Sequence, residues 1–485
     1  MRKILIIVGV MTSIIMPVKS GGLVTNSNQS ASYYRMLARG ASTTGDAVYY
    51  NPAGLVFLEE GLTISLNTQM IWMKRTINND LMTLNKDEFE GNLYVPFFPG
   101  IYAAYKTGNW AFSLGFNPPA GGGSVEFKEG LPMLERDVSF IPGRMTSMGI
   151  STSNYSMQSM MKGSSIVYGI QAGASYKINE MLSVSVGVRM MLANNSYEGY
   201  VRDIRVNPNL ESLGLPFPVE MLNAAELNAR GDAIANIASN HPDPETAALL
   251  GAVAGGLKMV AGNIPDQTLD VSQSGNGIAP ILGIHFKLNN LNLAAKYEFQ
   301  TNITIKNETK QNAMNMYPDG QELRSDVPAL LSLAGSYNIV PALKFSFTYL
   351  HHFEPQATLQ SWAPDATNPN GGIIIERQKL IDGGTNEYMA GLEFNVGKLI
   401  VSAGCQYSDV SVSDAWHNDI THNLDNFTLG LGAAYNFGEK LSLNIGGLTT
   451  WYTPVSVKGS INSLDYTQTY DRTNKAIAIG IEYRF

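Results

Sequence analysis

Few residues of this sequence belong to the types that usually carry out catalysis. The 485 residues include six histidines and one cysteine. The densest group of such residues occupies one polar stretch and consists of Asp414, His417, Asp419 and His422. Side chains of these types bind metals, but in a polar loop they are more often solvated charges, and no serine nucleophile motif accompanies the histidines. We therefore predict no catalytic residue, no metal site and no cofactor.

The single cysteine, Cys405, excludes an intrachain disulfide and a thiolate-based zinc site. It shares strand parity with Leu399, Val401 and Ala403, which form an apolar face. Because an activated thiol needs a polar neighbourhood, Cys405 is interpreted as a packing residue. A formal charge of −8 and a pI of about 5.4 give no electrostatic footprint for nucleic acid.

The first twenty residues are typical of an export signal. Arg2 and Lys3 precede an apolar run over 4–16, and the sequence Val18-Lys19-Ser20 suits a cleavage site of the small-x-small type. The apolar run is too short to span a bilayer, which needs about 20 residues. We predict a signal peptide over residues 1–20 and a mature chain from Gly21, with an uncleaved anchor as the alternative.

Most of the remaining chain alternates with a period of two, which indicates strands. Apolar and polar residues alternate in residues 182–189, 291–300 and 427–437. The polar faces of these segments consist largely of Gly, Ser and Ala, as in a crowded lumen. The final strand carries an apolar face that ends on an aromatic residue and consists of Ile477, Ile479, Ile481, Tyr483 and Phe485. This resembles the terminal strand by which outer-membrane barrels are recognised, so Phe485 is expected to engage the barrel assembly machinery.

Short and long connections alternate along the chain, as in outer-membrane barrels with tight periplasmic turns and large external loops. Aromatic residues cluster beside the short turns, where an interfacial girdle belongs. The sequence therefore predicts an all-β protein: a monomeric transmembrane antiparallel β-barrel of about 14 strands over residues 61–485, in contact with the lipid of the bacterial outer membrane. The short turns are expected at 106–109, 177–180, 288–290, 338–341, 396–398 and 438–440.

Two of the long external loops have a distinctive composition. Residues 217–261 are predicted to be helical, with Asp243 capping a second helix that starts at Pro244. Residues 118–164 are rich in methionine, and this adaptable apolar loop could pack against those helices. Its methionines are Met133, Met145, Met148, Met157, Met160 and Met161.

Residues 21–60 lack strand alternation and are rich in small residues, so we predict a plug, or hatch, inside a barrel too wide for side chains to fill. The segment resembles the amino-terminal hatch of the FadL/TodX family of outer-membrane transporters for long-chain fatty acids and other hydrophobic compounds. A generic proline turn is the alternative for the motif. The matching residues are Ser30-Ala31, Arg39-Gly40-Ala41, Asp46-Ala47 and the tetrad Asn51, Pro52, Ala53 and Gly54.

The resemblance implies passive uptake of a hydrophobic small molecule, with long-chain fatty acids expected, through a hatch-gated barrel with lateral release beside a kinked third strand. Proline lacks the donor that a ladder needs, so the break is expected at Gly115, Pro118 and Pro119; a strand that simply ends at a loop is the alternative. A non-specific porin and a barrel enzyme of the lipase or protease type are the alternative functions.

Strand parity places two cations on the inner face that could anchor a ligand head group, Arg189 and Lys296. An arginine fork suits a carboxylate best. However, Glu298 lies close to both in the predicted barrel, so pairing across the lumen is favoured over ligand binding.

Overall fold

The structure is a computed structural model that describes residues 30–313, 315–365 and 368–485. The expected signal peptide and the first part of the expected hatch, residues 21–29, lie outside the described residues.

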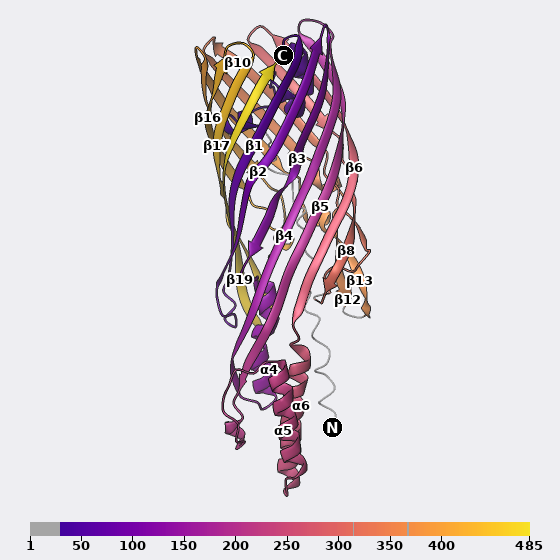
Figure 1. The fold of residues 1–485 in the computed structure, drawn as a ribbon, viewed down its shortest axis with the longest axis vertical. Coiled ribbons are helices and arrows are strands. Elements are labelled where there is room, and N and C mark those ends of the chain that lie inside the picture. Colours follow the sequence, from indigo (N-terminus) through magenta and orange to yellow (C-terminus); the bar gives the residue numbers. More distant parts are fainter. Residues whose placement is uncertain (1–29, 314, 366–367) are drawn as a thin grey trace.

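The predicted barrel of 14 strands is confirmed (Figure 1). The first and last strands pair along their length, which closes the sheet. Five further strands extend or decorate this wall: β8 (Thr304–Asn312), β9 (Glu322–Arg324), β18 (Val455–Ile461) and the separate hairpin of β12 (Gln360–Asp365) and β13 (Asn368–Glu376). The strands of the wall are β1 (Gly61–Asn79), β2 (Glu88–Thr107), β3 (Trp110–Phe127), β4 (Thr152–Lys177), β5 (Leu182–Pro208), β6 (Gln267–Leu288), β7 (Leu291–Glu298), β10 (Leu330–Val340), β11 (Leu343–His352), β14 (Asn386–Val396), β15 (Leu399–Asp409), β16 (Asn426–Phe437), β17 (Leu441–Tyr452) and β19 (Leu464–Arg484).

Alternation along the strands separates an apolar outer face from a small and polar inner face. In β19, Ile477, Ile479 and Ile481 are exposed while Ala476 and Ala478 are buried inside. Aromatic side chains beside the short turns are exposed on the outer face, where a membrane interface would meet them. These residues are Tyr105, Trp110, Tyr176, Tyr337, Phe394, Phe437 and Phe485.

The expected loop over 118–164 is too long, because β3 continues to Phe127 and β4 begins at Thr152. Pairing of Val125 with Gly163 carries the ladder past the two prolines, which sit at a bulge. Only Met133, Met145 and Met148 therefore belong to the loop, where α3 (Pro132–Ser139) and α4 (Ile141–Ser147) form. The assignment of Met157, Met160 and Met161 to the loop is wrong, since all three lie in β4.

The long connection between β5 and β6 forms a helical hairpin that projects beyond the barrel rim (Figure 1). It consists of α5 (Ala224–Ser239) and α6 (Pro244–Asn263), after a short 3-10 turn, η2 (Glu211–Leu213). Asp243 caps α6, because its carboxylate accepts a hydrogen bond from the Thr246 amide at 2.9 Å. Within the described residues, no helix is both long and apolar enough to cross a membrane.

Candidate functional site: the hatch and the cavity beside it

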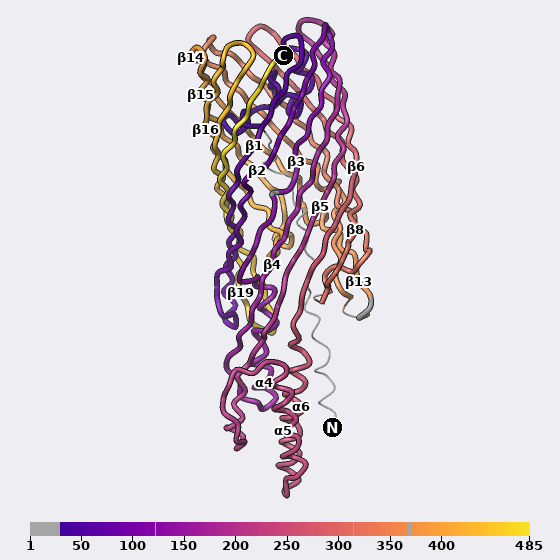
Figure 2. The backbone as a smooth tube through the Cα atoms, viewed as in Figure 1, coloured from indigo at the N-terminus to yellow at the C-terminus, as the bar shows by residue number. Residues whose placement is uncertain are grey.

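Residues 30–60, which we call the hatch, form a compact segment enclosed by the barrel wall (Figure 2). They fold into α1 (Ala31–Arg35), α2 (Ala47–Tyr50) and the 3-10 helix η1 (Pro52–Phe57). Ser30 caps α1 by accepting a hydrogen bond from the Tyr33 amide at 3.0 Å. Because most of these residues are buried, the hatch lies inside the barrel, at the end where the C-terminus lies.

Helix α1 docks on one side of the wall through charged and polar side chains. The Arg35 guanidinium donates to Glu393 of β14 at 2.7 Å and to Ser402 of β15 at 2.9 Å. The Tyr33 hydroxyl donates to Gln406 of β15, and the Tyr34 hydroxyl donates to Gln69 of β1 at 2.8 Å. These contacts fix the first turn of the hatch to β14, β15 and β1.

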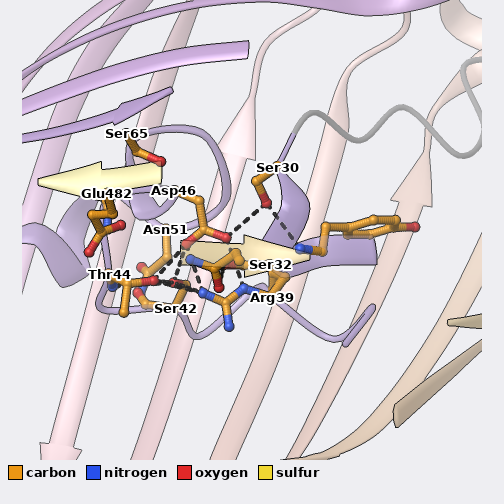
Figure 3. Close-up of polar contacts among 12 residues, drawn as sticks. Ser30, Ser32, Arg39, Ser42, Thr44, Asp46, Asn51, Ser65 and Glu482 are labelled. Carbon is orange, nitrogen blue, oxygen red and sulfur yellow. Dashed lines mark hydrogen bonds and ion pairs between the residues drawn. The ribbon is translucent and has the colours of Figure 1, made fainter. Parts of the chain in front are cut away.

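An ion pair inside the hatch links its two halves (Figure 3). Arg39 donates to both carboxylate oxygens of Asp46, at 2.9 and 2.8 Å, in the bidentate geometry that is strongest for this pair. Burial by itself raises the pKa of Asp46, but Arg39 and hydrogen bonds from Ser42 and Thr44 outweigh it and hold that pKa below its ordinary value. The carboxylate therefore stays ionised and keeps the turn between the halves closed.

The tetrad Asn51–Gly54 connects the second half of the hatch to the opposite wall. The Asn51 amide donates to the Ser42 carbonyl at 2.8 Å and lies 2.8 Å from Nδ1 of His285 in β6. The backbone carbonyls of Pro52 and Ala53 accept hydrogen bonds from Ser175 of β4 at 2.7 Å and Ser183 of β5 at 2.6 Å. Only glycine fits at 54, because a Cβ there would lie 2.5 Å from both Asn51 Nδ2 and the Ser42 carbonyl oxygen.

A cavity of about 240 Å³ lies between the hatch, the wall and the external loops. Tyr34 contributes the hatch's part of its lining. The walls are mainly apolar, and the side chains come from β1 to β5, β17, β19 and the loops. They include Ile71, Met73, Leu93, Phe98, Val125, Phe127, Leu131, Met161, Val167 and Leu448.

The wall of this cavity contains an interruption in the ladder between β2 and β3. Asn92 pairs with Glu126 and Ile101 with Phe116, but β2 residues 93–100 have no partner on β3. Pro118 and Pro119 lie in the unpaired part of β3, at a bulge against β4 between the pairs of Asn117 and Ala120. We call this place the β2–β3 gap.

Gly115 lies outside the β2–β3 gap. It pairs normally with Tyr102 of β2 and Gln171 of β4, so its assignment to the strand break is wrong. The ladder fails only after Phe116, where the two prolines cannot donate. Beside them, the side-chain amide of Asn117 is buried and makes no hydrogen bond among the described residues.

Comparison with known structures relates this arrangement to a group of solved barrels. A Pseudomonas aeruginosa FadL homologue superposes with a TM-score of 0.61 at 13% sequence identity, covering 96% of this chain and 100% of that one. The P. putida toluene transporter TodX gives 0.53 at 15% identity, covering 92% and 95%. The Ralstonia pickettii toluene transporter TbuX gives 0.52 at 14% identity, covering 95% and 99%.

The chain has the FadL/TodX-type fold. The resemblance read from the hatch residues is therefore confirmed at the level of the fold. No protein-family model matches the sequence. No curated protein matches it either.

In this FadL/TodX-type barrel, the two expected ligand anchors hold the hatch instead of facing the large cavity. Arg189 forms a buried ion pair with Glu298, and its guanidinium lies 4.7 Å from the ring centroid of Tyr49. Lys296 donates to the Tyr49 carbonyl at 2.9 Å. Both cations are thus occupied by Glu298 and by the hatch.

The loop between β15 and β16, residues 410–425, does not extend into solvent. Asp419 and His422 are buried, so the expectation that they are solvated charges is wrong. The loop folds over the lumen, where Ile420, Thr421 and His422 line the large cavity. Burial raises the pKa of Asp419, which accepts a hydrogen bond from the Met133 amide at 2.6 Å. The described residues hold no cluster of three potential metal ligands.

Sequence reasoning also missed two cavity residues, Arg75 in β1 and Arg472 in β19. The sequence shows that each arginine lies in a strand segment with alternating residues. Their proximity was not readable, because it depends on the closure of the barrel between its first and last strands.

Proposed function

We propose that this protein mediates passive uptake of hydrophobic small molecules, with long-chain fatty acids as the expected class, across the bacterial outer membrane. The ligand enters the apolar cavity, the hatch blocks the direct route to the periplasm, and the ligand leaves sideways through the β2–β3 gap. One observation carries this proposal: the interrupted ladder lies in the wall of the apolar cavity.

The interruption of the ladder has an energetic cost. A transmembrane wall must satisfy its backbone groups internally, because the hydrocarbon core offers no other partners. A stretch of unpaired wall is therefore expensive, and it serves a purpose if it lets an apolar molecule pass directly into the bilayer. Leu93, Phe98 and Val125 line both the cavity and the unpaired segments, so apolar side chains continue from the cavity to the β2–β3 gap.

The solved barrels with this fold support a hydrophobic ligand, since TodX and TbuX are named as toluene transporters. The hydrogen bonds and ion pairs between the hatch and the barrel wall support its role as a closed gate. The exposed Phe485 supports assembly as an outer-membrane barrel, and we propose that the folded chain acts as a monomer.

Closing the β2–β3 gap tests the lateral route. A Cβ at Gly123 would lie 2.8 Å from Cγ2 of Val95, so the pair Val95→Cys and Gly123→Cys, made with Cys405→Ser, can form a bridge across it. Uptake of a radiolabelled fatty acid into proteoliposomes should stop when the pair is oxidised and return on reduction.

A matched control places the bridge in an intact part of the wall. Thr428 and Thr450 face each other across β16 and β17, with hydroxyls 2.9 Å apart, and a cysteine pair there should leave uptake unchanged when oxidised. Full uptake through the oxidised Val95–Gly123 pair would refute lateral release. A large stable conductance of the parent would instead favour a porin, and ester hydrolysis abolished by His417→Ala would favour an enzyme.

A further inference from the structure

Two arginines stand directly opposite each other at the seam where the barrel closes. Arg75 of β1 and Arg472 of β19 are cross-strand partners, and both line the large cavity. Like charges at directly opposed positions of an antiparallel pair destabilise a sheet. The repulsion between the two arginines therefore needs either a compensating interaction within the protein or a functional role.

No compensating carboxylate is present among the described residues. Neither arginine takes part in an ion pair there, and both Nε atoms are buried without a hydrogen-bond partner. Arg75 has one long hydrogen bond, from Nη1 to the Ile420 carbonyl at 3.2 Å. The Arg472 guanidinium lies 4.9 Å from the ring centroid of Tyr452.

The acidic groups that line the same cavity are already engaged elsewhere. Asp326 accepts hydrogen bonds from Arg324 at 3.0 and 2.7 Å. Glu354 accepts from the amide and hydroxyl of Thr385, at 2.5 and 3.0 Å. The positive charge of Arg75 and Arg472 therefore remains available to a molecule in the cavity.

His422 adds a third polar group from the loop over the cavity. Its side chain is only 3% exposed, and its Nε2 atom has no partner among the described residues. Its ring stacks on Tyr470 with centroids 4.9 Å apart, and Nδ1 lies at a long 3.4 Å from the Asn418 carbonyl. Burial, and then Arg75 and Arg472, hold the pKa of His422 well below its ordinary value, so the ring is neutral. Because the Asn418 carbonyl can only accept, the single ring hydrogen lies on Nδ1 and Nε2 is an acceptor.

We propose that Arg75 and Arg472 bind the carboxylate head group of the transported molecule, beside the neutral ring of His422. The inference rests on the proposed function and narrows its substrate class to hydrophobic acids over neutral hydrocarbons. Two guanidinium groups offer forked donors that match a carboxylate, in a site sheltered from water where such hydrogen bonds are strong. The apolar walls of the cavity receive the hydrocarbon chain.

Binding of a matched acid and alcohol tests the site. Dodecanoate and dodecanol differ only in the head group, and their affinities can be measured by equilibrium dialysis with the purified barrel in nonionic detergent at pH 8. The parent should prefer dodecanoate. Arg75→Gln and Arg472→Gln should each lower the affinity for dodecanoate by tenfold or more and leave that for dodecanol unchanged.

Lys74→Gln is the matched control, because it removes the same charge from the neighbouring residue of β1, whose side chain is 44% exposed and pairs with Glu90. It should bind both probes as the parent does. Retention of the dodecanoate preference by both arginine variants would overturn the proposal. Equal losses for acid and alcohol would also overturn it, since the arginines would then only shape the cavity.

A second measurement needs no variant. The infrared band of ¹³C-carboxyl dodecanoate, followed against pH, gives the pKa of the bound acid, which should be lower than that of the acid in detergent alone because two cations favour the carboxylate. An unchanged or raised value would refute the site. The proposed function fails separately, if dodecanoate binds at this site but the barrel does not carry it across a membrane.

Discussion

Buried arginines have opposite surroundings in two parts of the lumen, the end that holds the hatch and the end that holds the cavity. In the hatch region, Arg35 pairs with Glu393, Arg39 with Asp46 and Arg189 with Glu298. In the cavity, Arg75 and Arg472 face each other without a carboxylate among the described residues. A buried charge is costly unless it is paired, so the difference separates a region closed by its own contacts from a region completed by a ligand.

Removing the hatch should break this comparison most severely. The barrel is stabilised by its interstrand hydrogen bonds and its apolar outer face, which the hatch does not supply. Deletion of residues 31–57 should therefore leave a folded, heat-modifiable barrel whose ion conductance in planar bilayers rises at least tenfold. A deletion variant as closed as the parent would show that the loops, and not the hatch, seal the lumen.

The next largest effect is expected from Glu393, where three cations of the hatch region converge. Glu393 pairs with Arg35 at 2.7 Å, lies 3.9 Å from Arg39 and pairs with Lys344. Glu393→Gln leaves buried charges unpaired, and breaking a buried pair costs about 3–5 kcal/mol. Hydrogen exchange of α1 should accelerate by two or more orders of magnitude. Glu88→Gln, an exposed change in β2, should have no such effect, and equal protection in both variants would contradict the role of Glu393.

A smaller effect is expected from Asn51, whose amide joins the Ser42 carbonyl to His285. Asn51→Ala leaves that buried carbonyl without its donor, at a cost of about 1–3 kcal/mol. The barrel should fold normally, while uptake of a hydrophobic ligand should change several-fold because the closed hatch is weakened. Asn395→Ala, at an exposed position near the end of β14, is the control. Uptake at the parent's rate would mean that Asn51 serves packing alone.

The strands and their connections were predictable because both follow local rules. Alternation in residues such as Ile477, Ile479 and Ile481 marks the outer face, and the short connections between strands mark the tight turns. The course of β3 past Pro118 and Pro119 was not predictable, because it depends on pairing with β4 and on the absence of pairing with β2. Local sequence cannot report a neighbour's register.

The candidate site divides in the same way. The tetrad Asn51–Gly54 was readable as a motif, because its geometry is set within four residues. Arg75 and Arg472 were not readable as a pair, since β1 and β19 meet only through barrel closure. The loop over 410–425 was misjudged for a related reason: its polar residues are buried by a fold-back that no periodicity reports.

Glu354 provides the smallest expected effect and extends the comparison to an acidic group of the cavity. Burial raises the pKa of Glu354 to about 7, above its ordinary value of about 4.3. Between these values the folded protein binds more protons than the unfolded chain, so Glu354's contribution to stability is fully present below about pH 4 and is lost as the pH rises through about 7. Glu354 lies in η3 (Glu354–Gln356) and accepts the Thr385 amide hydrogen. Protection of that amide against exchange, corrected for the intrinsic rate, should fall over this range. Glu354→Gln cannot ionise and should flatten the dependence; a parent profile as flat as that of the variant would show that Glu354 does not titrate in this window.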